Sequence, residues 1–544
     1  FNFGFVNDGL ISGQSILREF DALALRIEGS MVGGQLRTTT LNGGLYNSGT
    51  ILAQAREAEA IAIILGNGAI IPLLENAGTI SATTIGDGSN SVGIYIQAGA
   101  NVPLLRNTNF INVTTNGLNS STGIIDESNT LALIENSGVI FATISGGSTT
   151  FPTDYDSETS SGAESGSVNR TAIDVSASTI DVTYRQTPPG EGSSNSDSVV
   201  RGDIRFGSGN DTADIQGGFI DGDIYFGDGA DTLTVSGGGA IIGSLHDSDG
   251  QLAITVNDGQ LELRNDEAVQ LTEATFNDGS RLIFEVGRLD EDSRFINASG
   301  TVTFNEGATI TASLDGLIGE GAEFIVLTAN DLVINSAIES LQDTDAPYLY
   351  DTQIVRDPSN NNQLVLTLRR KTSEQLGMHE NRAAAYEAAF TAWTENNDLG
   401  NAFASLNNSA DFFEAYDQLL PEYAASAIQF AVASNDSAIG ALSNRLDAAR
   451  RSPDNTGGIW LQEFGYFADR EQSSFGPGYR GQGVGLAGGI DRPFGPLYAL
   501  GINFVGAASD IEESNGVDEP MTALTAQVGV YGGADFGGVL SGEF

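Results

Sequence analysis

The chain has no cysteine, only two histidines and a single lysine, Lys371, among its 544 residues. Without cysteine it has neither disulfides nor thiol chemistry, a composition compatible with an oxidising exterior. The two histidines, His246 and His379, fall in different predicted domains, so a Ser-His-Asp site is not expected. No glycine-rich loop follows a strand and opens a helix in the way that nucleotide binding requires. We therefore do not expect an enzyme.

Positive charge is also scarce, with 24 basic against 71 acidic residues and a net charge of −47. This charge argues against nucleic acid as a partner, because its phosphates have to be neutralised by cationic side chains. No apolar run approaches the roughly 18 residues of a membrane helix. If the chain meets a membrane, we expect it to do so with strands. The chain opens Phe1-Asn2-Phe3-Gly4 without a charged and apolar leader, so any signal peptide was removed or not included.

Residues 1 to about 185 carry an internal repeat. Motifs of the type Asn-x-Gly-x-Ile start at Asn47, Asn76 and Asn136, and a copy with Asn109 in place of the glycine starts at Asn107. The spacings are 29, 31 and 29 residues, and Asn7 opens an earlier, degenerate copy. Short apolar strands lie between the motifs. Repeats of this length indicate stacked units that bury their apolar faces against one another. The pattern predicts a right-handed parallel β-helix, each repeat forming one or more turns.

We expect this β-helix to span residues 1–345, with the Asn-x-Gly motifs along a single edge. Asn and Gly tolerate left-handed backbone, so they should turn the corner between strands, and the asparagines could form a ladder between rungs. With roughly twenty residues per rung and about 4.8 Å between rungs, the stack should be on the order of 80 Å long. Irregular strands then lead to a cap or junction at 346–372.

Two segments, 145–170 and 186–199, are rich in Ser, Gly, Pro, Thr and acidic residues. Such a composition cannot bury enough apolar surface to order itself. We interpret both segments as loops that protrude from the solenoid, where recognition sites are commonly found. Disorder without a binding role is the alternative.

A second repeat places Asp211 and Asp231 at the end of two GxGxD turns that lie twenty residues apart. These turns resemble the calcium-binding nonapeptide of repeats-in-toxin proteins, and the resemblance implies that Asp211 and Asp231 are candidate calcium ligands. Calcium rolls, however, use nine-residue tandem copies so that successive turns share ions. We therefore expect the two aspartates to stack one rung apart without bound metal, and we expect no other cofactor.

Residues 373–456 are rich in alanine, glutamate and leucine, which favours helices. Four are expected, at 383–393, 410–420, 424–433 and 436–451. From 457 to 544 the apolar residues alternate with small or polar ones. Tyr498, Leu500, Ile502 and Phe504 face one way. The glycines Gly481, Gly483, Gly485 and Gly501 face the other way, where their lack of side chains should leave room for a helix about ten to twelve ångströms wide. Strands of about ten residues with one apolar face are typical of membrane β-barrels, although a soluble sandwich gives the same alternation.

Residues 374–544 resemble the translocator domain of type Va autotransporters, the self-secreting outer-membrane proteins of Gram-negative bacteria. The resembling residues are Gly458-Ile459-Trp460-Leu461-Gln462, Leu419-Leu420-Pro421-Glu422-Tyr423-Ala424-Ala425 and the glycines at 481–489 and 501. The resemblance implies that 373–456 is a linker whose last helix fills the barrel and that 457–544 begins an antiparallel barrel. Family barrels have about a dozen strands. Here four or five are expected, so the barrel is incomplete and Phe544 is not a terminal assembly signal.

The resemblance implies an outer-membrane protein whose passenger is displayed at the cell surface or released. Its partners would be outer-membrane lipid and the barrel-assembly machinery, together with a ligand on a host or neighbouring cell. We expect an adhesive or structural role for the passenger. A secreted enzyme or toxin on the same scaffold, and a self-associating surface layer or filament, are the alternatives.

Overall fold

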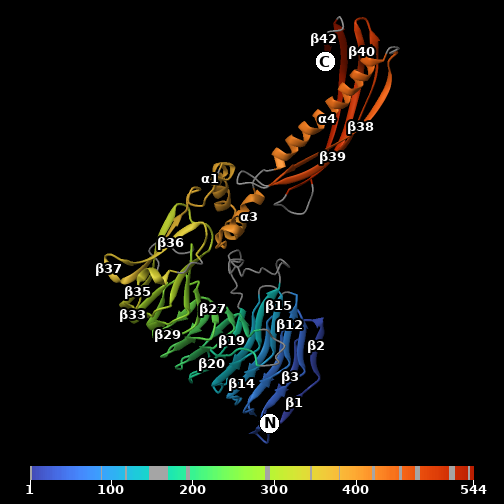
Figure 1. Ribbon diagram of the computed structural model, residues 1–544. Helices are drawn as coiled ribbons and strands as arrows, with labels where there is room; N and C mark the ends of the chain where they lie inside the picture. Colours follow the sequence, from blue (N-terminus) through green and yellow to red (C-terminus); the bar gives the residue numbers. More distant parts are fainter. Residues whose placement is uncertain are drawn as a thin grey trace. The chain divides into compact units, whose positions relative to one another are not determined.

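The computed structural model describes residues 3–86, 89–116, 119–145, 170–190, 197–287, 295–342, 346–378, 380–419, 423–452, 456–471, 478–513, 521–536 and 540–544. The chain is mainly β, with 57% of its residues in strands and 13% in helices. It divides into two compact units, Phe1–Arg370 and Lys371–Phe544. Figure 1 shows long sheets in the first unit, and helices with a separate sheet in the second.

Three long sheets, here named sheets A, B and C, build the first unit. Sheet A has the order β1 (Phe5–Asn7), β7 (Leu45–Asn47), β11 (Leu74–Asn76), β14 (Leu104–Asn107), β17 (Leu133–Asn136), β20 (Thr183–Gln186), β23 (Thr212–Ile215), β26 (Thr232–Val235), β29 (Leu252–Val256), β31 (Val269–Phe276), β33 (Ile296–Phe304), β35 (Gly321–Ile334), β37 (Asn360–Arg370) and β36 (Tyr350–Asp357). Sheet B has the order β2 (Leu10–Arg18), β8 (Thr50–Arg56), β12 (Thr79–Ile85), β15 (Phe110–Asn116), β18 (Val139–Ser145), β21 (Val199–Arg201), β24 (Phe219–Asp221), β27 (Gly239–Gly243), β30 (Gly259–Leu263), β32 (Ser280–Val286) and β34 (Thr309–Leu314).

Sheet C is shorter and ends while the other two continue. Its strands are β3 (Ala22–Ile27), β9 (Ala60–Leu65), β13 (Ser91–Ile96), β16 (Ser121–Asp126), β19 (Arg170–Asp174), β22 (Asp203–Arg205), β25 (Ile224–Phe226) and β28 (Leu245–Asp247). Two small pairs also form, β4 (Ser30–Val32) with β5 (Gln35–Arg37), and β6 (Thr39–Thr40) with β10 (Ala69–Ile70). All strand pairs within sheets B and C are parallel, as expected for stacked repeats.

The chain coils through these sheets in a β-helix-like manner. Up to β28 the order of the strands is sheet A, sheet B, sheet C and then sheet A again, and from β29 to β35 the strands alternate between sheets A and B. We name each turn from one sheet A strand to the next a rung. Asn47 pairs directly with Asn76, so one 29-residue repeat forms one rung. The prediction of roughly twenty residues per rung is therefore wrong for this part of the chain. The eleven steps from β1 to β35 span about 50 Å, not the predicted 80 Å.

The Asn-x-Gly motifs lie on a single edge, as predicted. Their asparagines occupy one register position at the end of the sheet A strands, where they are almost fully buried. Each side chain donates a hydrogen bond to the next, from Asn7 to Asn47 (2.7 Å), to Asn76 (2.8 Å), to Asn107 (2.8 Å) and to Asn136 (2.9 Å). The ladder satisfies polar groups that would otherwise be costly to bury.

The glycine of the motif has a different role from the predicted one. Neither Gly49 nor Gly78 has a positive φ, so left-handed backbone is not what the motif requires. A Cβ atom on Gly78 would lie 2.1 Å from the carbonyl oxygen of Gly49, and one on Gly49 would lie 2.1 Å from that of Gly9. The position needs glycine because consecutive rungs approach closely there.

The far end of the stack is closed by a change of strand direction. The strand β35 pairs in parallel with β33 on one side, and antiparallel with β37 on the other. Antiparallel β36 completes the edge, next to the 3₁₀ helix η2 (Ile338–Leu341). Leu364, Leu366 and Leu368 of β37 are fully buried, so these strands cover the apolar interior of the last rungs.

The second unit begins with three helices around an aromatic core. They are α1 (Glu380–Thr394), α2 (Asn397–Ala404) and α3 (Ser409–Leu419). Trp393 stacks on Phe403 at 3.9 Å between ring centroids and meets Tyr416 edge-on at 5.5 Å. The helix α2 was not predicted from the sequence. Asn396 caps its start by accepting a hydrogen bond from the Leu399 N–H.

A long helix, α4 (Tyr423–Arg451), follows. The two helices predicted at 424–433 and 436–451 are one, since neither Gly nor Pro interrupts the chain around Asn435. Leu420, Pro421 and Glu422, part of the family-like stretch, lie outside the described residues. Among the residues that are described, no helix combines the length and the apolar character needed to cross a membrane.

The last element is an antiparallel sheet of consecutive strands, with the curvature of a half-barrel. Its strands are β38 (Gly458–Arg470), β39 (Tyr479–Phe494), β40 (Leu497–Glu513), β41 (Met521–Phe536) and β42 (Leu540–Glu543). The helix α4 lies along one face of this sheet (Figure 1).

Candidate functional site: the two faces of the C-terminal sheet

The outer face of the C-terminal sheet, directed away from α4, is apolar and exposed. Its side chains are Ile459, Leu461 and Phe467 on β38, Val484, Leu486 and Ile490 on β39, Ile502 and Phe504 on β40, and Leu524, Val528 and Val530 on β41, each between 49% and 84% exposed. Glu463 is a carboxylate within this face. Such an extended apolar surface marks an interaction with an apolar partner or solvent.

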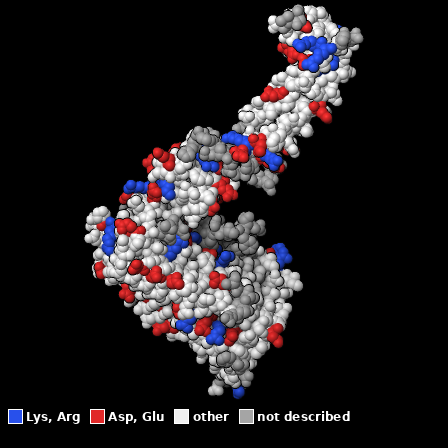
Figure 2. Space-filling model, viewed as in Figure 1, with Lys and Arg blue, Asp and Glu red and all other residues white. Residues whose placement is uncertain are grey.

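Charged residues gather toward the strand ends of this sheet. Figure 2 shows its visible surface largely white along the strands, with blue and red atoms near both ends. Asp469, Arg470 and Arg480 lie around one end of β38 and β39, and Arg492 lies near the other. An apolar band between two polar margins is the pattern expected for strands that cross a hydrocarbon layer.

The inner face, directed toward α4, is built from glycines paired with aromatic rings. Phe464 and Tyr466 of β38 stand opposite Gly485 and Gly483 of β39. A Cβ atom on Gly485 would lie 2.4 Å from the Phe464 ring, and one on Gly483 would lie 2.2 Å from the Tyr466 ring. Trp460 stands opposite Gly489 in the same way. The rings of one strand therefore lie flat over the glycines of the next.

This arrangement corrects part of the predicted role of the glycines. Gly483, Gly485 and Gly501 face inward as expected, but the space above them is filled by rings of neighbouring strands, Tyr531 in the case of Gly501. Gly481 alone of the predicted inward glycines meets α4 directly, with the Phe430 ring 2.3 Å from a Cβ built on it. Tyr498, predicted to face outward with Ile502, packs against the inner cluster at an irregularity in the β40–β41 pairing.

The helix α4 presents one narrow stripe to the sheet. Its buried residues are Phe430, Ser434, Ala438, Ala441, Leu446 and Ala449. All but one of the intervals between them are three or four residues, the spacing that keeps side chains on one helix face. Ala438 and Ala441 pack against Ala487 and Val505 of the sheet, with Trp460 and Phe464 beside them. Small residues on both partners allow the helix to approach the strands closely.

A buried polar network fixes the helix to the sheet. Arg445 of α4 donates two hydrogen bonds to the Asp491 carboxylate, at 2.8 Å to Oδ2 and 2.7 Å to Oδ1. Tyr531 donates to Asp491 Oδ2 at 2.7 Å, and Trp460 donates from its indole N–H to the Tyr531 hydroxyl. Asp491 is 4% exposed, so this bidentate pair is both shielded from water and geometrically specific.

This network was not predicted, although the sequence carries a signal for it. Asp491 follows Gly485, Ala487 and Gly489 at alternate positions, so strand periodicity alone places its carboxylate on the inner face. A charge on a buried face calls for a partner of opposite sign. Arg445, in the predicted helix at 436–451, was available for that role.

Asp211 and Asp231 lie in the first unit, one rung apart as predicted. Asp211 Oδ1 accepts a hydrogen bond from the Val182 N–H at 2.7 Å, and Asp231 Oδ1 accepts one from the Asp211 N–H at 2.7 Å. Both are buried, and the second carboxylate oxygen of each has no hydrogen-bond partner. Within the described part of the chain, no cluster of three or more metal-ligating side chains forms. The carboxylates cap backbone N–H groups of the preceding rung.

Calcium binding at these turns is tested by titration. We expect isothermal titration of the full chain with calcium to show no binding tighter than about millimolar, because two carboxylates with half their oxygens engaged fall short of the six to eight ligands that calcium takes. Saturable micromolar binding that is lost in Asp231→Ala would contradict this expectation and assign the site to calcium.

The stability of the first unit should depend on the protonation of Asp231. Burial, with the neighbouring Asp211 carboxylate as a smaller cause, raises the pKa of Asp231 from 3.8 to about 7. The folded chain therefore holds this proton more tightly than the unfolded chain. The resulting stabilisation is complete below about pH 4 and is lost as the pH rises through about 7.

We expect the melting temperature of the first unit, followed by circular dichroism, to be lower at pH 8 than at pH 5. Asp231→Asn keeps an acceptor for the Asp211 N–H and stays neutral, so it should reduce the difference. Asp228→Asn, at an exposed position in the same turn, is the matched control and should leave the difference unchanged. Equal pH dependence in all three proteins would refute the assignment to Asp231.

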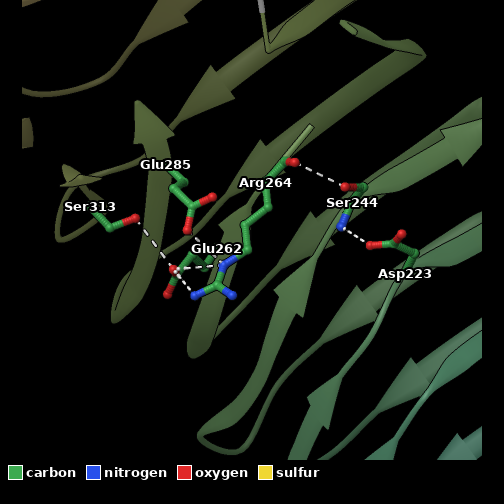
Figure 3. Close-up of polar contacts among 6 residues, drawn as sticks. All are labelled: Asp223, Ser244, Glu262, Arg264, Glu285 and Ser313. Atoms are coloured by element: carbon green, nitrogen blue, oxygen red, sulfur yellow. Dashed lines mark hydrogen bonds and ion pairs between the residues drawn. The ribbon is translucent and has the colours of Figure 1, made fainter. Parts of the chain in front are cut away.

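An ion cluster lies on the rungs that follow. Arg264 contacts Glu262 (Nη2 to Oε1, 3.1 Å) and Glu285 (Nε to Oε1, 3.1 Å), and Ser313 donates to Glu262 at 3.3 Å. Figure 3 shows these side chains converging from neighbouring strands, with Ser244 bonded to the Arg264 carbonyl oxygen. Two carboxylates that share one guanidinium cross-link β30, β32 and β34, an arrangement suited to holding rungs together.

His246 stacks on Tyr225 with 4.4 Å between ring centroids, and Arg205 lies 4.1 Å above the same Tyr225 ring. His379 lies outside the described residues. Of the predicted loops, residues 146–169 and 191–196 also lie outside them, between β18 and β19 and between β20 and β21.

Comparison of the chain with protein-family models, with curated proteins and with solved structures finds no match. A function for this chain therefore has to be inferred from its own residues and their geometry.

Proposed function

We propose that this chain is an autotransporter-type outer-membrane protein. In this proposal Phe1–Arg370 is a passenger with the fold of a right-handed parallel β-helix, and the C-terminal sheet is part of a translocator barrel whose outer face contacts lipid. The helix α4 is the segment that occupies the barrel interior. The passenger is displayed at the cell surface or released, and the barrel-assembly machinery inserts the strands.

The observation that carries this proposal is the partition of the C-terminal sheet into two unlike faces. Outward residues such as Leu524 and Val528 are each 83% exposed, and water is an unfavourable solvent for so much contiguous apolar surface. The inward face is covered by α4 and holds its polar groups in the Arg445–Asp491 network. A sheet with apolar side chains on its outward face and small or polar side chains on its inward face is typical of a membrane barrel rather than of a soluble sandwich.

The proposed role of the passenger is adhesive or structural. The chain has a net charge of −47, and the segments proposed to recognise a host or neighbouring cell are 145–170 and 186–199. The proposal includes no catalytic activity and no cofactor. The alternative is that the passenger self-associates into a surface layer. An electron micrograph distinguishes the two, because a surface layer gives lateral arrays, whereas a passenger that does not self-associate gives isolated rods.

Flotation with lipid vesicles tests the membrane assignment. The full chain, refolded in the presence of vesicles, should float with the lipid. Val528→Arg places a charge on the outward face, where it costs about 2 to 4 kcal/mol in a bilayer, and should move most of the protein to the unbound fraction. Gln527→Arg, the adjacent inward position, is the matched control and should float as before. Equal flotation of both variants, or none for the parent chain, would overturn the proposal.

A further inference from the structure

One row of outward positions on sheet A changes from charged residues to threonines along the stack. From β11 to β23 the row is charged, and its side chains pair with one another. Arg106 pairs with Glu75 (3.6 Å) and with Glu135 (2.8 Å). Arg185 pairs with Asp214 (2.9 Å). The next rungs carry threonine at the same register position, and we name these residues the threonine row: Thr234, Thr255, Thr275 and Thr303.

The threonine row faces away from the interior of the stack and is partly exposed. Leu233 and Ile254, which directly precede Thr234 and Thr255, are 0% and 1% exposed. Alternation along each strand therefore directs the threonines outward. Among the described residues, none bonds to the hydroxyl groups of the row. Because threonine is branched at Cβ, its hydroxyl and methyl groups are held in few orientations.

A row of amides runs beside the threonine row. Asn257, Asn277 and Asn305 each follow a threonine of that row by two residues. Asn277 donates to Asn257 Oδ1 (2.8 Å) and accepts from Asn305 Nδ2 (2.5 Å). A carboxamide has two N–H groups and an oxygen with two lone pairs, so these bonds leave Asn277 one donor and one acceptor. The two rows therefore offer hydroxyl and amide groups that the described side chains do not use.

Neither row contains a charged residue, although the chain has 71 acidic and 24 basic residues. Acidic side chains lie beside the rows instead, with Glu273 on β31 and Asp331 on β35. These carboxylates would repel an anionic ligand, and a cationic ligand would meet its partner charges beside the rows rather than within them. The rows therefore fit an uncharged ligand that both donates and accepts hydrogen bonds.

The hydrogen-bonding groups of this surface repeat at a regular spacing. Adjacent threonines of the row lie one strand spacing apart, about 4.8 Å, so the row is about 14 Å long. An extended β-linked polysaccharide places one sugar ring after another with a similar repeat. Each ring presents hydroxyl groups beside C–H groups, as each threonine presents a hydroxyl beside a methyl. A rigid row of this kind has little conformational freedom to lose when it binds.

We propose that the threonine row and the amides beside it bind an extended, uncharged β-linked polysaccharide that lies along the stack. Successive sugar hydroxyls exchange hydrogen bonds with Thr255 and Thr275, and Asn277 contributes its remaining N–H group and oxygen lone pair. The surface lies within sheet A, with further strands of the sheet on both sides of it. This binding goes beyond the proposed function and is independent of whether the C-terminal sheet contacts lipid.

The probe is cellohexaose, a soluble and uncharged hexasaccharide of β-linked glucose. Isothermal titration of the full chain, in a detergent without a sugar head group, should show saturable binding with a Kd below about 1 mM. Maltohexaose has the same sugar and the same length, but its α-linkages coil the chain. It should reach fewer hydroxyls of the row and bind about tenfold more weakly. This comparison uses the unmodified protein, so it does not depend on the folding of any variant.

The protein side is tested with the double variant Thr255→Val and Thr275→Val, which removes two hydroxyls and keeps the shape of both side chains. The loss of two hydrogen bonds should weaken the binding of cellohexaose about tenfold. Thr79→Val with Thr83→Val is the matched control, because both threonines face outward on β12 of sheet B, and it should bind as the parent chain does. Valine favours strands, so both double variants should fold, which circular dichroism checks.

Three results of the titrations would overturn the proposal: no saturable binding of cellohexaose to the parent chain, equal binding of maltohexaose, or equal binding of cellohexaose by the two double variants. Analytical ultracentrifugation without sugar tests a second copy as the occupant. A dimer of the parent chain that dissociates in the variant with Thr255→Val and Thr275→Val would also overturn the proposal, because the surface would then be occupied by a second copy.

Discussion

Gly485→Trp should abolish surface display of the first unit, whereas Leu486→Trp should leave it intact. Gly485 faces inward, where a Cβ atom alone would lie 2.4 Å from the Phe464 ring. An indole there has to displace Phe464 and with it the surface on which α4 packs. Leu486 faces outward and is 49% exposed, so a larger apolar side chain meets no protein atoms of the inner face. We expect surface display to be lost almost completely in Gly485→Trp and to be unchanged in Leu486→Trp.

The measurement is the accessibility of the first unit to external protease in cells that produce each full-length variant. Total protein detected after cell lysis controls for expression, and circular dichroism of the β-rich first unit controls for its folding. Equal display of both variants would show that the alternation along β39 does not separate an interior from a lipid-facing surface. The barrel proposal would then lose its main physical support.

Arg445→Ala should destabilise the packing of α4 on the sheet by about 3 to 5 kcal/mol, the usual cost of removing one member of a buried ion pair. The Asp491 carboxylate is 4% exposed. Once the Arg445 guanidinium is removed, Tyr531 is the side chain of this network that still donates a hydrogen bond to it. Replacing both members, as Arg445→Met with Asp491→Leu, should recover much of the loss because no unpaired buried charge remains.

Thermal unfolding of the full chain in detergent micelles, followed by the fluorescence of Trp460 in a Trp393→Phe background, measures this effect. Arg451→Ala is the matched control on the same helix. Arg451 pairs with Asp447 at 2.8 Å, but its side chain is 74% exposed, so its loss should cost less than about 1 kcal/mol. If both alanine variants melt alike, the buried network does not hold the helix.

Periodicity in the sequence was sufficient to predict which face of each C-terminal strand is apolar. Ile502 and Phe504 are exposed, and Ala499 and Gly501 are buried, as the alternation indicates. The repeat of Asn47, Asn76 and Asn107 likewise placed these residues at one register position. Both predictions succeed because strand geometry repeats every two residues and stacked rungs repeat with the sequence motif.

The sequence did not show why glycine is required at particular positions. The glycines of the Asn-x-Gly motif were attributed to left-handed backbone, whereas Gly78 is needed for the close approach of the Gly49 carbonyl. The inward glycines of β39 were attributed to room for a helix, whereas Phe464 and Tyr466 fill that space. In each case the atom that a Cβ on the glycine would meet belongs to an adjacent strand. A pattern within one strand does not specify which atom of the adjacent strand lies closest to the glycine.

The sequence by itself determined the β-rich first unit, the repeat that stacks it, the helical segment and the two-faced strands at the end. These properties follow from composition and spacing, which act over a few residues. Only the tertiary structure decided that one repeat makes one rung, that α4 is continuous, and that Arg445 meets Asp491, which is 46 residues away. Register and long-range pairing decided these features, because they depend on which distant segments share the burial of apolar surface.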